Sequence, residues 1–172
     1  MNINQIKNVL ENTCKGLCRQ EDKVWVTYAE LSNIVSYSIL VDNSDQAKVI
    51  GARGKNIKAI KNIFENIEAE SESGKFKTVK VFLDSESPAR SKPEKFKSSV
   101  EWDSEPYADL AFNLYKLYSN DVEIEFDDIG SLSVFEVKNG RSCPGFISRS
   151  IKHLMESIGK CKGGTIDINY VE

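Results

Sequence analysis

The sequence has few of the residues on which enzyme active sites depend. It contains one histidine among 172 residues, and no serine, cysteine or histidine lies in a recognisable nucleophile motif. The phosphate-binding pattern Gly-x-x-x-x-Gly-Lys-Ser/Thr is missing as well, because Gly54-Lys55 is followed by Asn56. No pair of carboxylates is recognisable as a general acid and base. We therefore expect a protein that is not an enzyme and that uses no cofactor.

Long apolar runs are also missing. No stretch of about 18 apolar residues occurs, so we expect no membrane span and no membrane partner. Residues 1–8 are polar and no apolar core follows them, which is unlike a signal peptide. The expected location is the cytoplasm.

Cysteine is scarce, and its spacing does not suggest a metal site. Cys14 and Cys18 lie four residues apart on the apolar face of an expected helix, which favours small buried side chains in a reducing compartment. Cys143 and Cys161 are the other two, and neither pair has Cys-x-x-Cys spacing. We predict no bound metal.

A strong excess of positive charge is missing too, since the net charge is −3. The charge is unevenly distributed, however. Residues 1–84 carry a net charge of +1, residues 85–100 carry +2, and residues 101–172 carry −6. The first two segments can therefore face a polyanion, with modest and salt-sensitive affinity, whereas the last segment mostly cannot.

One stretch combines the features of an anion-binding site. The loop Gly51-Ala52-Arg53-Gly54 lies between a short helical turn, capped by Ser44 or Asp45, and an amphipathic helix. The two glycines allow a sharp bend and keep side chains away from an approaching phosphate. Arg53, Lys55 and the positive N-terminal end of the following helix add favourable charge. That helix has apolar residues at helical spacing: Ile57, Ile60, Phe64 and Ile67.

Ile50-Gly51-x-x-Gly54-x-x-Ile57, with a basic residue inside the loop, resembles the signature of the KH domain, a binder of single-stranded nucleic acid. The order of the surrounding elements strengthens the resemblance. We expect a helix, two strands, the helix–loop–helix and a last strand, over residues 3–18, 23–30, 34–41, 45–67 and 77–83. This α-β-β-α-α-β order is similar to the type II, bacterial-style KH fold. The alternative is a tight turn between two helices of an unrelated α/β domain.

The resemblance covers residues 1–84 and implies a clamp for about four nucleotides. Backbone amides of the loop, with Arg53 and Lys55, would hold phosphates, and aliphatic side chains would line the groove under the bases. The implied contact residues are Val49, Ile50, Gly51, Ala52, Arg53, Gly54, Lys55, Ile57 and Lys58. Trp25 and Tyr28 are better explained by packing, because the groove of a KH domain is typically aliphatic.

Residues 85–100 have the composition of a linker, with two prolines, five serines and four basic residues. A plain tether explains them. As a secondary possibility, their basic side chains contact phosphates: Arg90, Lys92, Lys95 and Lys97.

Residues 101–172 repeat the order of the first half as α-β-β-α-β. The expected helix begins after Ser104, and the strands are centred on residues 122–126, 132–137 and 166–170, with a second helix over 146–158 ended by Gly159. Aligned with the first half, Gly145 takes the place of Gly51, and Ser148 that of Gly54. Pro144 interrupts the lead-in turn. We therefore expect an α+β protein of two tandem type II KH-like domains, each a three-stranded sheet packed by helices, the second degenerate and a poor phosphate binder.

A second resemblance competes for the same region. Arg149 and His153 have the Arg-x-x-x-His spacing of a small nucleic-acid-binding module that accompanies KH domains in some bacterial proteins. Four residues apart on a helix, the two side chains would share a face and grip phosphate.

The sequence thus predicts a bacterial or phage protein that binds single-stranded RNA in preference to DNA, acting in post-transcriptional regulation or RNA protection. The alternative is a KH-shaped adaptor without RNA binding, whose acidic second domain contacts a protein partner or a second copy of the chain.

Overall fold

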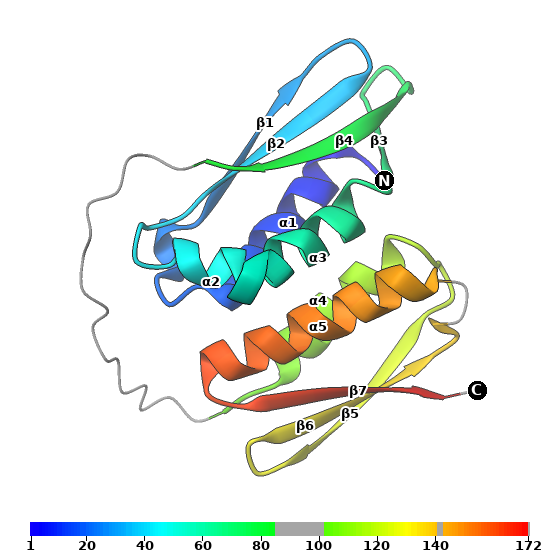
Figure 1. Cartoon of the computed structure of the whole chain (residues 1–172). Helices are drawn as coiled ribbons and strands as arrows, with labels where there is room; N and C mark the ends of the chain where they lie inside the picture. The colour runs from blue at the N-terminus through cyan, green and yellow to red at the C-terminus, as the bar shows by residue number, and fades with distance from the viewer. Residues whose placement is uncertain (85–101, 141–142, 172) are drawn as a thin grey trace.

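The computed structural model describes residues 1–84, 102–140 and 143–171, and the predicted linker lies outside this part of the chain. Two β-sheets form the outer layers, and the helices of both halves pack between them (Figure 1). The mixed α+β architecture predicted from the sequence is confirmed. No helix within the described residues is long and apolar enough to cross a membrane.

The N-terminal half follows the predicted α-β-β-α-α-β order with one additional strand. Its elements are α1 (Ile3–Leu17), β1 (Trp25–Glu30), β2 (Ile34–Leu40), α2 (Gln46–Ile50), α3 (Lys55–Phe64), β3 (Glu68–Glu70) and β4 (Phe76–Leu83), with 3-10 turns η1 (Glu21–Lys23) and η2 (Ala52–Gly54). The sheet order is β1-β2-β4-β3, in which β2 and β4 are parallel and the other pairs are antiparallel.

The prediction of three strands in this half is therefore wrong by one. Residues 68–74 lie between the last two elements expected from the sequence, yet Glu68–Glu70 pairs with β4 along the edge of the sheet. Only Ala69 of this strand is buried. A three-residue strand with a single inward side chain leaves no period-two pattern to detect.

The C-terminal half has the predicted elements with longer bounds. They are α4 (Glu105–Lys116), β5 (Glu123–Ile129), β6 (Leu132–Lys138), α5 (Gly145–Lys162) and β7 (Thr165–Val171). The sheet order is β5-β6-β7, with an antiparallel and then a parallel pair. This is the same pairing pattern as β1-β2-β4 of the first half.

Three helix ends differ from the prediction. Helix α3 ends at Phe64 rather than Ile67. Helix α5 continues through Gly159 to Lys162 and ends at Gly163, which has a φ of 88°. Gly159 remains helical because it makes room for β7: a Cβ there would lie 3.0 Å from the backbone N of Ile166. Ser104 precedes α4 as predicted, but its hydroxyl donates to Asp128 instead of capping the helix.

A single apolar core joins the two halves, because buried side chains of all four long helices belong to one cluster. Helices α1 and α5 approach closely at Gly16, where an added Cβ would lie 3.0 Å from Cδ1 of Ile158. At one end of this contact the Lys162 ammonium donates to the backbone carbonyl of Cys18 at 2.7 Å and pairs with Glu21. The helical faces of the two halves therefore cover each other.

The cysteines lie in this core. Cys14, Cys18 and Cys143 are buried and Cys161 is half-buried. Burial raises the pKa of the Cys18 thiol to about 12, so this side chain is an uncharged apolar group at neutral pH. The prediction that Cys14 and Cys18 share a buried face is confirmed.

Candidate nucleic-acid interface

The Gly51–Gly54 segment forms a sharp bend between α2 and α3, as the sequence predicted. Three of its four residues have positive φ: Gly51 at 75°, Arg53 at 56° and Gly54 at 73°. Glycine adopts this region readily, whereas arginine adopts it only with strain. The two helices are therefore separate, and the bend projects outward between them.

The lead-in helix α2 is held by a buried carboxylate. Asp45 is the N-terminal residue preceding α2, but its side chain does not cap that helix. Its Oδ2 accepts hydrogen bonds from the backbone N–H groups of Arg19 at 3.1 Å and Gln20 at 2.9 Å. The predicted capping role is therefore replaced by an anchor between the end of α1 and the start of α2.

Two of the four amides in the bend are used internally. The N–H of Gly51 donates to the carbonyl of Ala47 at 2.9 Å, and that of Gly54 donates to the carbonyl of Gly51 at 3.1 Å. Among the described residues, the N–H groups of Ala52 and Arg53 have no acceptor. The expectation that every amide from Gly51 to Gly54 faces a phosphate is therefore reduced to these two.

The side chains around the bend divide into exposed and buried groups. Ile50 is 40% exposed and Ile57 is half-buried, so together they present an aliphatic surface beside the bend. Val49 has no exposed surface and belongs to the core, which corrects its expected place in the groove. Its position on the inner side of α2 explains this burial.

The exposed side chains of the bend and of the first turn of α3 carry positive charge. Arg53, Lys55 and Lys58 are exposed, and none of them forms an ion pair with another described residue. The first turn of α3 has no acidic residue, and its N-terminal end is not capped by a side chain. The helix dipole and three cations therefore make the surroundings of the bend positive.

Asn56, which was not among the predicted site residues, is buried directly behind the bend. A Cβ on Gly51 would lie only 2.7 Å from Cγ of Asn56. In the sequence, Asn56 occupies the apolar face of α3, four residues before Ile60, and a polar residue at such a position is a recognisable anomaly.

In the described part of the C-terminal half, no equivalent bend precedes α5. Helix α5 runs continuously from Gly145, and Gly145 does not have a positive φ. Of the predicted Arg-x-x-x-His pair, Arg149 is exposed, whereas Nε2 of His153 lies 2.8 Å from Oδ1 of Asn56. Because His153 is turned toward α3, the two side chains do not form a joint phosphate site, and that secondary assignment is corrected.

Other predicted contacts have different outcomes. Arg90, Lys92, Lys95 and Lys97 lie outside the described residues. Trp25 and Tyr28, for which packing in the core or on the surface was expected, are exposed at 57% and 41%, and the ring centroid of Tyr28 lies 6.0 Å from that of Tyr37. Within the described residues, no group of three or more His, Cys, Asp or Glu side chains is placed to hold a metal ion.

The element order and the bend of the N-terminal half resemble those of a KH domain. Residues 7–81 match the family model for the KH domain of KhpA and KhpB, and over these residues the chain is similar to the KH domain family. Two curated relatives are called RNA-binding protein KhpA, from Streptococcus pneumoniae serotype 4 (strain ATCC BAA-334 / TIGR4) and serotype 2 (strain D39 / NCTC 7466). Each is 27% identical over 82 residues, which cover 48% of this chain and 98% of the relative.

Proposed function

We propose that this protein binds single-stranded RNA through the bend at Gly51–Gly54 and acts in post-transcriptional regulation or RNA protection. The observation that carries the proposal is the conjunction, at one exposed bend, of two amides without acceptors, three unpaired cations and the start of α3. The match to the KhpA/KhpB KH domain and the name of the relatives, RNA-binding protein KhpA, support RNA binding.

In this proposal the N–H groups of Ala52 and Arg53 donate to a phosphate, and the side chains of Arg53, Lys55 and Lys58 neutralise neighbouring phosphates. Ile50 and Ile57 lie beside them and offer an apolar surface to the bases. Residues 101–172 form a degenerate KH-like domain that has kept the sheet and helices and lost the bend. No catalytic role is proposed.

The proposal is tested by placing two carboxylates at the bend. The Ala52→Asp, Arg53→Asp variant should lose binding to single-stranded RNA, because both residues are exposed and would repel phosphate. The fold should be retained, since aspartate tolerates the positive φ of Arg53 better than most residues do. Fluorescence anisotropy with a labelled random-sequence RNA measures binding, and the melting temperature reports on the fold.

A matched control carries the same change in charge at the opposite end of the sheet. Ser32→Asp with Lys75→Asp alters two exposed residues in the β1–β2 and β3–β4 connections. This variant should bind RNA nearly as well as the unmodified protein at moderate salt. Undiminished binding by the Ala52→Asp, Arg53→Asp variant would refute the proposal.

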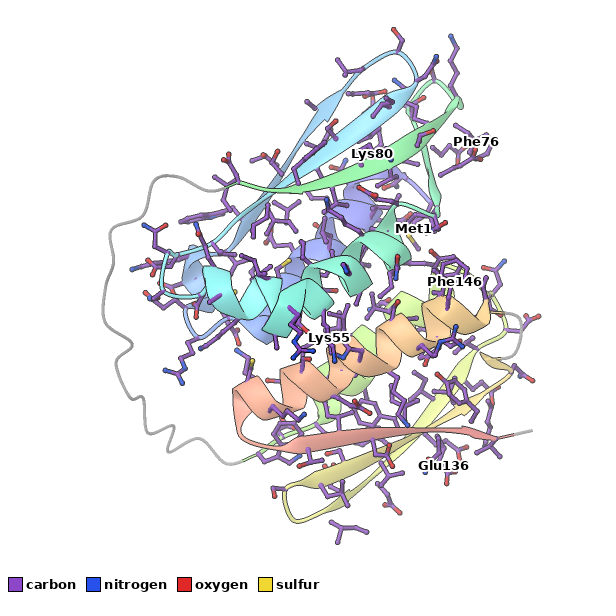
Figure 2. All side chains as sticks on the ribbon, in the orientation of Figure 1. Met1, Lys55, Phe76, Lys80, Glu136 and Phe146 are labelled. Atoms are coloured by element: carbon purple, nitrogen blue, oxygen red, sulfur yellow. The ribbon has the colours of Figure 1, made fainter. Side chains whose placement is uncertain are left out.

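A second candidate, a protein adaptor, is favoured by one surface. The outer face of the C-terminal sheet carries five carboxylates, and Glu125 lies directly opposite Glu136 across β5 and β6. Figure 2 shows Glu136 on the side of this sheet that faces away from the helices. Lys138 pairs with Glu125 and Lys152 pairs with Asp167, and the face still carries more carboxylates than cations, so it suits a basic protein partner. The five residues are Glu123, Glu125, Asp127, Glu136 and Asp167.

A salt titration separates the two candidates. An RNA binder loses affinity steadily as the salt concentration rises, whereas an adaptor of this kind shows no RNA affinity even at low salt.

A further inference from the structure

The support of the bend comes from both halves of the chain. Gly51 packs flat against Asn56, with the backbone N of Asn56 and its Cβ each 2.9 Å from where a Cβ on Gly51 would be. Gly54 is much less confined, since the nearest atom to its added Cβ, Cγ2 of Ile57, is 3.9 Å away. The position of Asn56 therefore determines where the first residue of the bend lies.

Both polar atoms of the Asn56 side chain form hydrogen bonds. Asn56 is 6% exposed, and its Nδ2 donates to the backbone carbonyl of Lys48 in α2 at 2.8 Å. This bond leaves Oδ1 as the acceptor. Ser157 Oγ donates to Oδ1 at 3.0 Å, and His153 donates from Nε2 at 2.8 Å. Both donors belong to α5 of the C-terminal half.

These contacts connect α5 to both sides of the bend. Asn56 carries the connection to Gly51 directly and to α2 through the carbonyl of Lys48. Helix α2 has five residues, which is too short to hold its conformation without tertiary contacts. If the two donors on α5 were removed, Oδ1 of Asn56 would be buried without a partner, and the amide would turn or move toward water.

The geometry points to His153 and Ser157 as positioning residues for the RNA-binding bend. They fix Asn56, and Asn56 fixes Gly51 and α2, so the half that has lost its own bend sets the affinity of the bend in the other half. The effect on RNA affinity rests on the proposed function, whereas the effect on the bend itself does not. Figure 2 shows Lys55, the first residue of α3, beside α5.

The test uses the full chain with His153→Ala and Ser157→Ala combined. In the RNA-free protein, the backbone amide resonances of Gly51, Arg53 and Gly54 should shift or broaden in a ¹H–¹⁵N spectrum. If the competent fraction of the bend falls to about one fifth, the dissociation constant for single-stranded RNA rises about fivefold. The His153→Gln variant keeps a hydrogen-bond donor at this position, so it should bind RNA more tightly than the double alanine variant does.

A matched control removes a different hydrogen bond from the same helix pair. Asn62 Nδ2 donates to Ser150 Oγ at 3.3 Å, and this pair touches neither Asn56 nor the bend. The Asn62→Ala variant should leave the resonances of Gly51–Gly54 and the RNA affinity unchanged. Ser157→Ala alone removes one hydroxyl and provides the readout in a fully folded chain if the double variant is unstable.

Unchanged bend resonances in both the double variant and Ser157→Ala would overturn the inference. So would equal shifts in the Asn62→Ala control, because the effect would then belong to the helix pair in general. If the resonances shift and the unmodified protein binds no RNA, the positioning role stands and the proposed function fails.

Discussion

In the N-terminal half, α3 follows a bend with three positive φ angles, whereas in the C-terminal half α5 runs without interruption from Gly145 to Lys162. Both halves nevertheless pair their strands in the same pattern and cover one sheet face with helices. A Pro residue before Gly145 and a Ser at position 148 distinguish the second sequence. The same strand pairing, with helices on one face of the sheet, therefore forms with the bend in one half and without it in the other.

The largest difference between the halves is expected when Gly51 and its aligned residue Gly145 are each replaced by alanine. Gly51→Ala places a Cβ 2.7 Å from Cγ of Asn56 at a φ of 75°, so the free energy of unfolding should fall by about 2–3 kcal/mol. RNA affinity should fall with it. Chemical denaturation and anisotropy measure the two effects.

Gly145→Ala is the matched substitution. Its Cβ would meet nothing closer than Nη1 of Arg149 at 3.7 Å, and the free energy of unfolding should change by no more than about 0.5 kcal/mol. Equal destabilisation by the two substitutions would remove the contrast between the halves.

A smaller difference, in the salt dependence of RNA binding, is expected when the aligned residues Lys58 and Lys152 are replaced. Lys58 is exposed without an ion pair, whereas the ammonium of Lys152 lies 3.2 Å from Asp167 and donates to the carbonyl of Ile168. Lys58→Ala should lower the slope of log affinity against log salt by about 0.7, the value for one lost phosphate contact with a single strand. Lys152→Ala should leave this slope unchanged. If only Lys152→Ala changed this slope, the RNA would lie on the C-terminal half, contrary to the proposed function.

The smallest effect concerns pH and the aligned positions Ala59 and His153. Burial lowers the pKa of His153 below its ordinary value of 6.5, whereas Ala59 cannot titrate. The folded state therefore favours neutral imidazole. The contribution of the neutral His153 imidazole to stability is complete above about pH 6.5. It is lost as the pH falls through the pKa of His153 in the folded state, which is lower than the unfolded value.

Urea denaturation between pH 7 and 5.5 measures this contribution. The unmodified protein should lose more stability over this interval than His153→Gln does. Since His153 is the only histidine, its imidazole resonance gives the pKa directly. A measured pKa of 6.5 or above would contradict the expectation.

Much of the fold could be predicted because its patterns are local. Strands β2 and β4 alternate inward and outward side chains, and the Gly-x-x-Gly spacing predicts the bend. Strand β1 buries only Val26, although its sequence also alternates. Strand β3 could not be predicted, because Glu-Ala-Glu places one side chain inward. The extension of α5 past Gly159 was missed because a glycine can serve close packing as well as helix termination.

The support of the bend could not be predicted, because it depends on which helical faces meet. Periodicity identifies the apolar faces of α3 and α5 but does not say that they pack on each other. Asn56 on such a face indicates a buried partner without naming it, and His153 alone was consistent with a nucleic-acid contact. Likewise, the sequence alone does not distinguish the buried Val49 from its exposed neighbour Ile50, because the orientation of α2 decides which of the two faces the core.

The hydrogen bond between Asn56 and His153 joins residues 97 positions apart. During synthesis, the bend emerges from the ribosome well before the residues that hold it in place. At 5–20 residues per second, the delay is on the order of 5–20 s. A nascent chain therefore contains the bend before it contains the residues that support it, and the support is completed only after His153 and Ser157 have been synthesised.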